Sequence, residues 1–363
     1  MGLSESRIAF FHIAELIICL WGHCLHQACP VSGKKRGFFT MPKGYANRLH
    51  ITGQPDQLEA LQQWGLGDRI PYYGQAIHQS IKLFVAGCAG LLQPTETTDY
   101  SLYPALVAKG TGVDSPENRA FEQWLALLKE NVALDEVTSQ QISRLYQQSG
   151  LAARKWEMLL PAEQETIMAL FNQKSCDWFG LVDWDGERDT KMLWSHLDDR
   201  LTETVPGDLF LLIPTHLASE INGFCGGLLR DHETTHELYY RLYGMTRPRG
   251  YDIAWKHHDN GSLTGHFDTA PWEPWDEKIM VPLSRQYHCH ITHYFEDVCD
   301  FCGYDKYWNG QWEEGRVDEL ELGEEDGIRK VIGPAYILGN VLHDGDECPD
   351  SVISLIPQGR FPW

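Results

Sequence analysis

The sequence predicts an α+β fold, in which helices and strands are mixed without a regular strand–helix–strand repeat. Two pairs, Asn260-Gly261 and Asn309-Gly310, each stand between short strand-like segments and predict β-hairpins. Residues 116–149 and 155–173 instead repeat apolar side chains at helical spacing. Because no regular alternation joins these patterns, a doubly wound parallel sheet is disfavoured.

Residues 41–69 are predicted to form an N-terminal strand–turn–helix unit. Leu49 and Ile51 alternate on one face of a strand that ends at Gly53. Pro55 then stands where a helix would begin.

Residues 70–174 are predicted to be a mainly helical insertion. The first part, 70–112, is rich in Gly, Thr and Tyr and has little periodicity, so no regular element is predicted there. The helices of the insertion are therefore expected within 116–149 and 155–173.

Residues 175–312 are predicted to form an α+β domain. Helices are expected from Ser219 to Gly244, which would act as the C-cap, and from Pro274 to Tyr287. Strands are expected at 176–184, 209–213, 251–257, 262–267, 289–295 and 304–308, with Trp312 beyond the second hairpin turn.

The two ends of the chain differ from this middle part. Residues 313–363 are predicted to be an acidic C-terminal extension with short strands at 335–338 and 352–356. Residues 1–40 are predicted to be a leader or an upstream-translated segment, with the natural start at Met41. Their apolar run, 8–20, is shorter than a membrane span and has no clear signal-peptide cleavage site.

Composition narrows the possible partners. The 363 residues carry a net charge of -21, and no dense Lys/Arg cluster is present, which argues against direct binding to nucleic acid. The ten Cys are spread through a chain much larger than a disulfide scaffold, so we expect free thiols in a reducing cytoplasm. Because the apolar run 8–20 is too short to span a bilayer, we expect no membrane attachment. The sequence does not indicate an oligomeric state.

Several segments resemble the YubB-like family of plasmid and prophage proteins. The resemblance rests on Met41-Pro42 with Ala46-Asn47-Arg48-Leu49, and on Phe267-Asp268-Thr269-Ala270-Pro271-Trp272 with the segment through Asn309-Gly310. It departs from the family at 255–259. The resemblance implies a ferredoxin-like domain carrying a helical insertion, a mobile genetic element as the source, and no particular catalytic activity.

The sharpest chemical motif is His232-Glu233-Thr234-Thr235-His236, a literal H-E-x-x-H. On a helix, the spacing would place His232 and His236 on one face to bind Zn²⁺, with Glu233 polarising a bound water, as in a zinc peptidase. The third ligand would be Glu273 or Glu277. The alternative, which we favour, is that the histidines make hydrogen bonds at the edge of a core while Glu237 pairs with Arg241.

A second possible zinc motif, Cys299-x-x-Cys302 with nearby histidines, lacks a second pair of ligands, so packed free thiols are favoured. We therefore expect no cofactor, with Zn²⁺ as the alternative.

The function favoured by the sequence is binding to another protein. Trp308 and Trp312 lie beside Glu313 and Glu314, which combines aromatic anchors with negative charge. We expect these four residues to dock on a partner with a basic surface. The hypothesis is a non-enzymatic acidic protein that inhibits a host nucleic-acid-handling or defence protein; the alternative is the zinc hydrolase.

Overall fold

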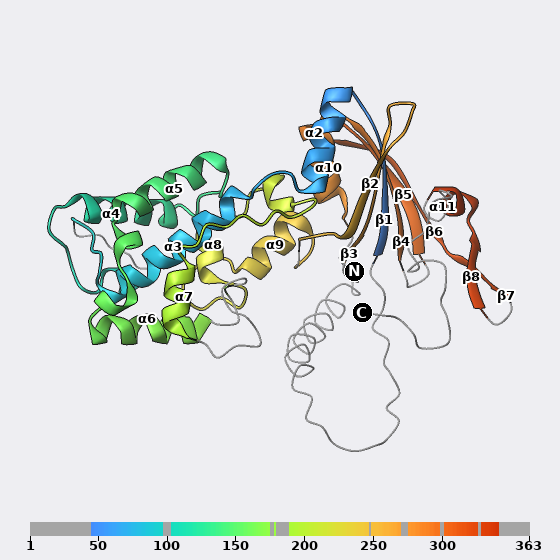
Figure 1. Ribbon diagram of the computed structural model, residues 1–363. Coiled ribbons are helices and arrows are strands. Elements are labelled where there is room, and N and C mark those ends of the chain that lie inside the picture. Colours follow the sequence, from blue (N-terminus) through green and yellow to red (C-terminus); the bar gives the residue numbers. More distant parts are fainter. Residues whose placement is uncertain are drawn as a thin grey trace, which may run out of the picture. The chain divides into compact units, whose positions relative to one another are not determined.

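A computed structural model describes residues 45–96, 103–174, 178, 189–246, 248–269, 275–297, 301–325 and 328–340 (Figure 1). The strands are β1 (Tyr45–Thr52), β2 (Tyr251–His257), β3 (Leu263–Thr269), β4 (His290–Asp297), β5 (Phe301–Trp308), β6 (Gln311–Glu319), β7 (Glu321–Glu325) and β8 (Ile328–Gly333). The α-helices are α2 (Pro55–Leu66), α3 (Tyr72–Ala89), α4 (Pro116–Lys129), α5 (Glu136–Gln148), α6 (Pro161–Lys174), α7 (Thr190–His196), α8 (Leu217–Asn222), α9 (Thr235–Tyr243), α10 (Glu277–Gln286) and α11 (Ala335–Asn340). Short 3₁₀ turns lie at Pro104–Val107, Leu151–Ala153, Trp156–Met158 and Leu209–Leu211.

The sheet confirms the predicted α+β class and the ferredoxin-like domain. Six strands pair in the order β2-β3-β1-β4-β5-β6, and every pairing among them is antiparallel. Apart from the insertion that carries α3 to α9 between α2 and β2, the chain order is β1, α2, β2, β3, α10 and β4, that is strand, helix, strand, strand, helix, strand. That order, with β4-β1-β3-β2 in space, is the ferredoxin-like arrangement. Strands β5 and β6 extend it, and β7 and β8 form a separate pair.

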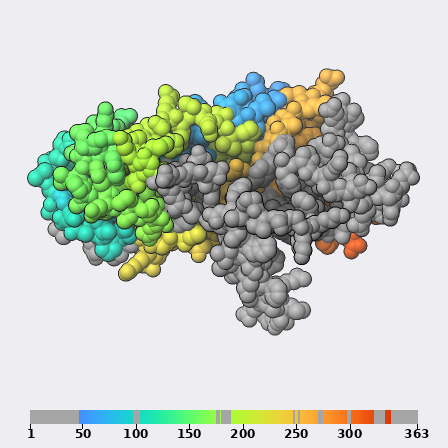
Figure 2. Space-filling view, turned by 60° about the horizontal axis from the view of Figure 1, so that its bottom comes forward, coloured from blue at the N-terminus to red at the C-terminus, as the bar shows by residue number. Residues whose placement is uncertain are grey.

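One face of the sheet is buried under α2 and α10. Strand β1 places Leu49 and Ile51 on this face because side chains alternate along a strand. Trp64 of α2 and Trp275, which precedes α10, pack together at a centroid separation of 6.2 Å. In the space-filling view α2 (blue) lies beside the β2–β3 segment (gold) (Figure 2). The Trp255 ring packs against Gly65 of α2, so closely that a Cβ there would overlap it. These aromatic contacts attach both helices to the sheet.

The helical insertion is built around α3, which the sequence did not predict. Nearly all its side chains after Gln75 are buried, so it lacks the apolar and polar faces that periodicity detects. Even Lys82 is buried, where its ammonium group bonds to Asp198 and lies 4.4 Å from the Trp194 ring centroid. Helices α4, α5 and α6, which were predicted, surround α3 with Phe121, Trp124 and other apolar residues.

The structure places the domain boundaries differently from the prediction. The 41–69 unit is not separate, because β1 lies in the middle of the sheet and α2 covers it. Helices continue beyond 174 as far as α9, so the insertion is longer than predicted and the first part of 175–312 belongs to it. The predicted acidic extension also begins too early, since β6 runs to Glu319 within the sheet.

Several local predictions were wrong. Residues 209–211 form a 3₁₀ turn instead of a strand, and 335–340 form α11 instead of a strand. The predicted helix from Ser219 to Gly244 is two helices, because the chain turns through Gly223, Gly226 and Gly227 at positive φ. The predicted leader and the predicted strand at 352–356 lie outside the described residues, as does 176–184 apart from Trp178.

Both predicted hairpins are confirmed. Strands β2 and β3 flank Asn260-Gly261, and β5 and β6 flank Asn309-Gly310. Asn309 and Gly310 both have positive φ, as a two-residue hairpin turn of this kind requires. The helix predicted from Pro274 is also present, although it begins at Glu277, where Asp276 caps it.

Candidate functional site

The H-E-x-x-H segment does not lie on one helix. Helix α9 begins at Thr235, and Thr234 is its N-cap in a reciprocal capping box with Glu237. His232 and Glu233 therefore precede the helix, and only His236 belongs to it. The geometric premise of the zinc alternative, two imidazoles one helical turn apart, is wrong.

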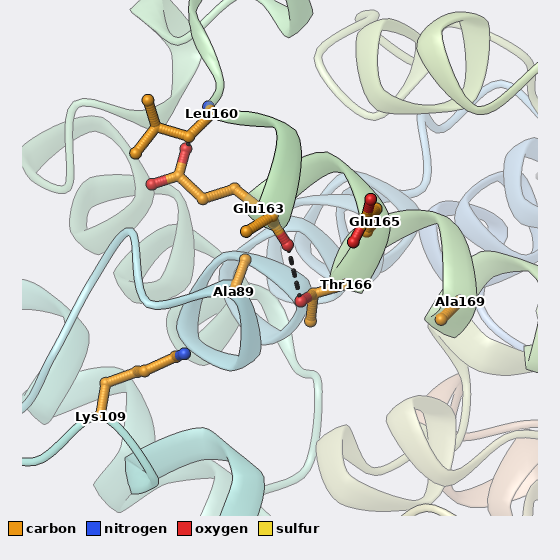
Figure 3. A pocket seen from close by; sticks show the side chains of 8 residues that line it. Ala89, Lys109, Leu160, Glu163, Glu165, Thr166 and Ala169 are labelled. Atoms are coloured by element: carbon orange, nitrogen blue, oxygen red, sulfur yellow. Dashed lines mark hydrogen bonds between the residues drawn. The ribbon is translucent and has the colours of Figure 1, made fainter.

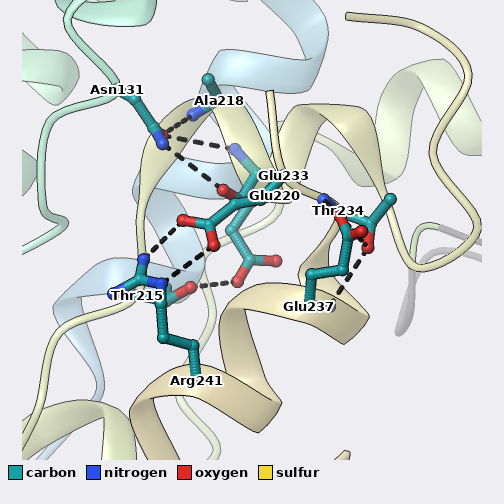
Figure 4. Close-up of polar contacts among 9 residues, drawn as sticks. Asn131, Thr215, Ala218, Glu220, Glu233, Thr234, Glu237 and Arg241 are labelled. Carbon is teal, nitrogen blue, oxygen red and sulfur yellow. Dashed lines mark hydrogen bonds and ion pairs between the residues drawn. The ribbon is translucent and has the colours of Figure 1, made fainter. Parts of the chain in front are cut away.

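The Glu233 carboxylate forms an ion pair with an arginine. Arg241 of α9 donates from Nε to Oε2 of Glu233 at 3.0 Å and from Nη2 to the other carboxylate oxygen (Figure 4). The expectation that Arg241 pairs with Glu237 was wrong, because the Glu237 carboxylate accepts the N–H and hydroxyl of Thr234. A carboxylate held by a bidentate arginine is poorly placed to polarise a metal-bound water.

The two histidines have different surroundings. Burial lowers the pKa of His232, and its Nε2 has no hydrogen-bond partner among the described residues. The His236 ring meets Phe224 edge to face at 5.0 Å. Within the described ranges, no three His, Cys, Asp or Glu side chains come together as metal ligands would. Cys302 is buried beside Tyr336 of α11, whereas Cys299 and Glu273 lie outside the described residues.

The structure reveals a half-buried carboxyl group with a perturbed pKa, Glu220 of α8, that sequence reasoning missed. Tyr239 donates its hydroxyl to Glu220 Oε1 at 2.8 Å. Thr215 also donates to that oxygen (Figure 4). Burial raises the pKa of Glu220 to about 7, although both hydrogen bonds oppose the shift. A single glutamate in a helix gives no sequence signal of such burial.

Asp208 is a second buried carboxyl group. Tyr73 donates its hydroxyl to Asp208 Oδ2 at 2.8 Å, and Trp64 donates to the Asp208 backbone carbonyl at the same distance. Burial raises the pKa of Asp208 to about 6. Perturbed acids of this kind often occur in active sites. Here each carboxyl group already accepts a hydrogen bond from a tyrosine hydroxyl, and no nucleophile or base lies among the described partners of either group.

A shallow pocket lies elsewhere, against α6 (Figure 3). Its volume, about 610 Å³, is large enough for a small molecule. Its polar groups are already used by the helix: Glu163 accepts the Leu160 N–H at 2.7 Å, and Thr166 donates to the Ala162 carbonyl at 3.0 Å. The lining residues are Ala89, Lys109, Leu160, Ala162, Glu163, Glu165, Thr166 and Ala169. This lining contains neither an aromatic side chain nor a nucleophile–base pair.

The predicted partner-binding residues all lie on the β5–β6 hairpin. Trp312 is paired with Tyr307 and Glu314 with Lys306, and the register shifts between them, which leaves Glu313 as the extra residue. Directly paired residues project to the same face of a sheet. Trp312 therefore lies on the face that buries Tyr307, whereas Glu314 lies on the opposite face.

The two tryptophans consequently do not form one patch. Trp308 stacks on His290 of β4 at a centroid distance of 3.8 Å, on the same face as Glu314. Trp312 donates its indole N–H to Asp305 Oδ1 at 2.9 Å on the other face. Trp308 is 38% exposed and Trp312 is 53% exposed, so both rings reach solvent.

Strand β6 is the last strand of the sheet and is exposed along its length. Every residue from Gln311 to Val317 is exposed. Glu314 pairs with Lys306 and Arg316 pairs with Asp318, while Glu313 and Glu319 have no ion pair in the described part of the chain. From 311 to 325 the sequence carries seven acidic residues and one basic residue. The hairpin therefore presents negative charge and aromatic surface at one edge of the sheet.

No helix among the described residues is long and apolar enough to cross a bilayer.

Two family models match the chain. One, described as a protein of unknown function (DUF1281), matches residues 70–247, and the other, described as the ferredoxin-like domain in Api92-like protein, matches residues 250–335. The chain is 39% identical to the uncharacterized protein YubA of Escherichia coli (strain K12) over 166 residues, which are 46% of this chain and 97% of YubA. It is 31% identical to the uncharacterized protein YubB of the same strain over 145 residues, 39% of this chain and 99% of YubB. The crystal structure of protein api92 from Yersinia pseudotuberculosis matches with a TM-score of 0.70 and 38% identity, covering 78% of this chain and 100% of that one.

Proposed function

Since this chain belongs to the DUF1281 family and has a ferredoxin-like carboxy-terminal domain, we propose from its own geometry that it is a non-enzymatic binding protein. It docks through the β5–β6 hairpin on a protein partner with a basic surface. The observation that carries this proposal is the exposed edge strand β6, which combines Trp312 with unpaired carboxylates.

The hairpin has the composition of a charge-selective interface. Aromatic side chains supply contact area at low conformational cost, and charge at the rim speeds encounter with a partner of opposite sign. Trp312 is already oriented by its hydrogen bond to Asp305. Less side-chain freedom is therefore lost when a partner covers the ring.

Binding is preferred to hydrolysis because of what surrounds the candidate catalytic groups. Glu233 is held by Arg241, and His232 and His236 do not share a helix face. Glu220 and Asp208 each accept a hydrogen bond from a tyrosine hydroxyl. The zinc hydrolase alternative therefore gains no support from the described site.

The proposed partner is a nucleic-acid-handling or defence protein of a bacterial host. Such proteins carry dense positive surfaces for phosphates, and a negative edge can occupy such a surface. The net charge of -21 disfavours direct binding to nucleic acid. We place the protein in the host cytoplasm as the product of a plasmid or prophage, and infer that its docking inhibits the partner.

Capture from a bacterial lysate tests this function. The full chain is immobilised and washed with buffers that span the range from weak to strong charge screening, about 0.05 to 0.5 M salt. We expect a basic protein to be retained at low salt and released as salt rises. The variant Glu313→Gln/Glu319→Gln should retain less of it.

The matched control is Glu59→Gln/Glu203→Gln, which removes two exposed negative charges away from the hairpin. It should retain as much partner as the wild type. Failure to retain any basic protein at low salt, or equal losses in both variants, would contradict docking through the hairpin.

A further inference from the structure

We propose that β6 binds its partner by strand addition, so that an extended basic segment of the partner pairs with β6 as a seventh strand of the sheet. This inference rests on the proposed function and specifies the partner's conformation and side-chain pattern. Strand addition is a known mode of peptide recognition in which main-chain hydrogen bonds supply affinity and alternating side chains supply specificity.

The open edge of β6 is the first step of the argument. Among the described strands, β6 pairs only with β5. Residues Gln311 to Val317 are all exposed, including Val317 at 64% and Trp312 at 53%. A strand exposed on both faces and paired on one side offers main-chain N–H and C=O groups along its other side.

The placement of the side chains is the second step. Trp312 and Val317 lie on one face of the hairpin, opposite Tyr307 and Gly303. Glu314 and Asp318 lie on the other face, opposite Lys306 and Cys302. A globular surface that docked on one face would reach only one of these sets. An extended segment along the edge reaches both, because its own side chains alternate between the faces.

Glycine in the middle of β6 leaves room on the aromatic face. A Cβ at position 315 would collide with Asp305 Oδ1, the oxygen that accepts the Trp312 indole N–H. Gly315 therefore permits the contact that orients Trp312 while leaving little side-chain bulk between Trp312 and Val317. Apolar side chains of an added strand can occupy this space.

The negative charge of β6 determines which segments can pair with its open edge as an added strand. Exposed edges risk unwanted pairing, and charged residues and bulges at an edge reduce that risk. Pairing of β6 with β6 of a second copy would bring like charges together, including the unpaired Glu313 and Glu319. A segment in which apolar residues alternate with Lys or Arg instead brings positive charge to the edge that carries Glu313 and Glu319, which have no ion pair among the described residues.

Synthetic peptides test strand addition on the full-length chain. The probe is a fluorescently labelled peptide of alternating Lys and Val, about nine residues long to match β6. Two further peptides carry N-methyl groups on alternate amides, one set on each edge of the strand. In a strand, one set removes the donors that would face β6, and the other removes those that face away.

Anisotropy titrations should show binding of the unmodified peptide and of one N-methylated peptide, and at least about tenfold weaker binding of the other. Trp312→Ala should weaken the unmodified peptide about tenfold as well. A peptide with the same composition arranged as a Lys block and a Val block should bind less tightly.

The outcomes separate this inference from the proposed function. If both N-methylated peptides bind as well as the unmodified one, or if no peptide binds while capture of a basic protein still depends on Glu313 and Glu319, strand addition is wrong and docking remains. If capture fails too, both proposals fail. Concentration-dependent dimerisation that Trp312→Ala abolishes would assign the edge to a second copy and overturn the inference.

Discussion

Glu220 lies where its ionisation costs free energy. The carboxyl group accepts hydrogen bonds from Tyr239 and Thr215, and desolvation raises its pKa from 4.5 to about 7. Between these two values the native protein holds a proton on Glu220 that the unfolded chain has released. Because the native state binds more protons, the free energy of unfolding falls as pH rises through this interval.

Glu220→Gln should remove this pH dependence while keeping the acceptor oxygen. We expect the wild type, compared with the variant, to lose on the order of 2–3 kcal/mol between pH 4.5 and pH 8. Urea unfolding at several pH values measures the difference. Buried His78 and His293, with their pKa values lowered to about 4 and about 3, act in the opposite direction but are common to both proteins. If the free energy of unfolding of the wild type and of Glu220→Gln changed equally with pH, the pKa of Glu220 would be the same in the native and unfolded states, and the prediction would be wrong.

Glu233 provides a second residue-scale prediction, which bears on the zinc alternative. Glu233→Gln weakens the pair with Arg241, and a partly exposed pair of this kind contributes about 0.2–1 kcal/mol. We expect a small loss of thermal stability and no stabilisation of the wild type by added Zn²⁺, measured by calorimetry. A rise in melting temperature with equimolar Zn²⁺ that His232→Ala abolishes would restore the metal hypothesis.

At the scale of elements, prediction succeeded where local chemistry determines structure. The Asn-Gly pairs identified both hairpins, and amphipathic spacing identified α4 and α5. Helix α3 was missed because it is buried on most of its circumference and so has no periodic pattern. Its end signals, Pro71 before it and Gly90 after it, were present in the sequence.

The candidate site was predictable only in part, for related reasons. H-E-x-x-H spacing implies shared geometry only within a helix, and Thr234-x-x-Glu237 was itself a capping-box signal that the helix begins after Thr234. The opposite faces of Trp308 and Trp312 follow from the two-residue turn, which pairs Trp308 with Gln311 and Tyr307 with Trp312, whereas the register shift beyond Trp312 sets the face of Glu314. A bulge changes the face that each residue occupies, and nothing in the sequence of the turn reports it.

Packing against α3 should outweigh helix propensity at Gly87. Alanine is usually better than glycine inside a helix by up to about 1 kcal/mol. At position 87, however, the added Cβ would overlap the Phe121 ring in the helical core. We therefore expect Gly87→Ala to destabilise the protein by about 1–3 kcal/mol. Chemical denaturation measures this.

Gly74→Ala is the matched control in the same helix. Its Cβ would meet only a methyl group of Leu201, at 3.0 Å, at the end of a flexible side chain. It should be neutral or slightly stabilising. Stabilisation by both substitutions would mean that α3 packs more loosely against Phe121 than the structure shows.

At the scale of the whole molecule, the helical core and the sheet core are connected through Phe210. This partly buried ring packs against both clusters. Its centroid lies 5.0 Å from that of Tyr73 in α3 and 5.3 and 5.6 Å from those of Tyr239 and Tyr243 in α9. The sheet core also contains Tyr239 and Tyr243 themselves, so the insertion contributes to the core of the domain that it interrupts.

Phe210→Ala should therefore loosen both cores together. We expect a loss of about 2–4 kcal/mol, below the full range for buried phenylalanine because the ring is only partly buried. Hydrogen exchange should show faster exchange both in α3 and in the strands β1 and β3, since the cavity borders side chains of both clusters. Phe301→Ala, at a phenylalanine that is 50% exposed on β5, is the control and should cost less than about 1 kcal/mol. If only α3 loses protection in Phe210→Ala, the two cores are energetically independent, and the insertion stabilises itself without supporting the sheet that carries β6.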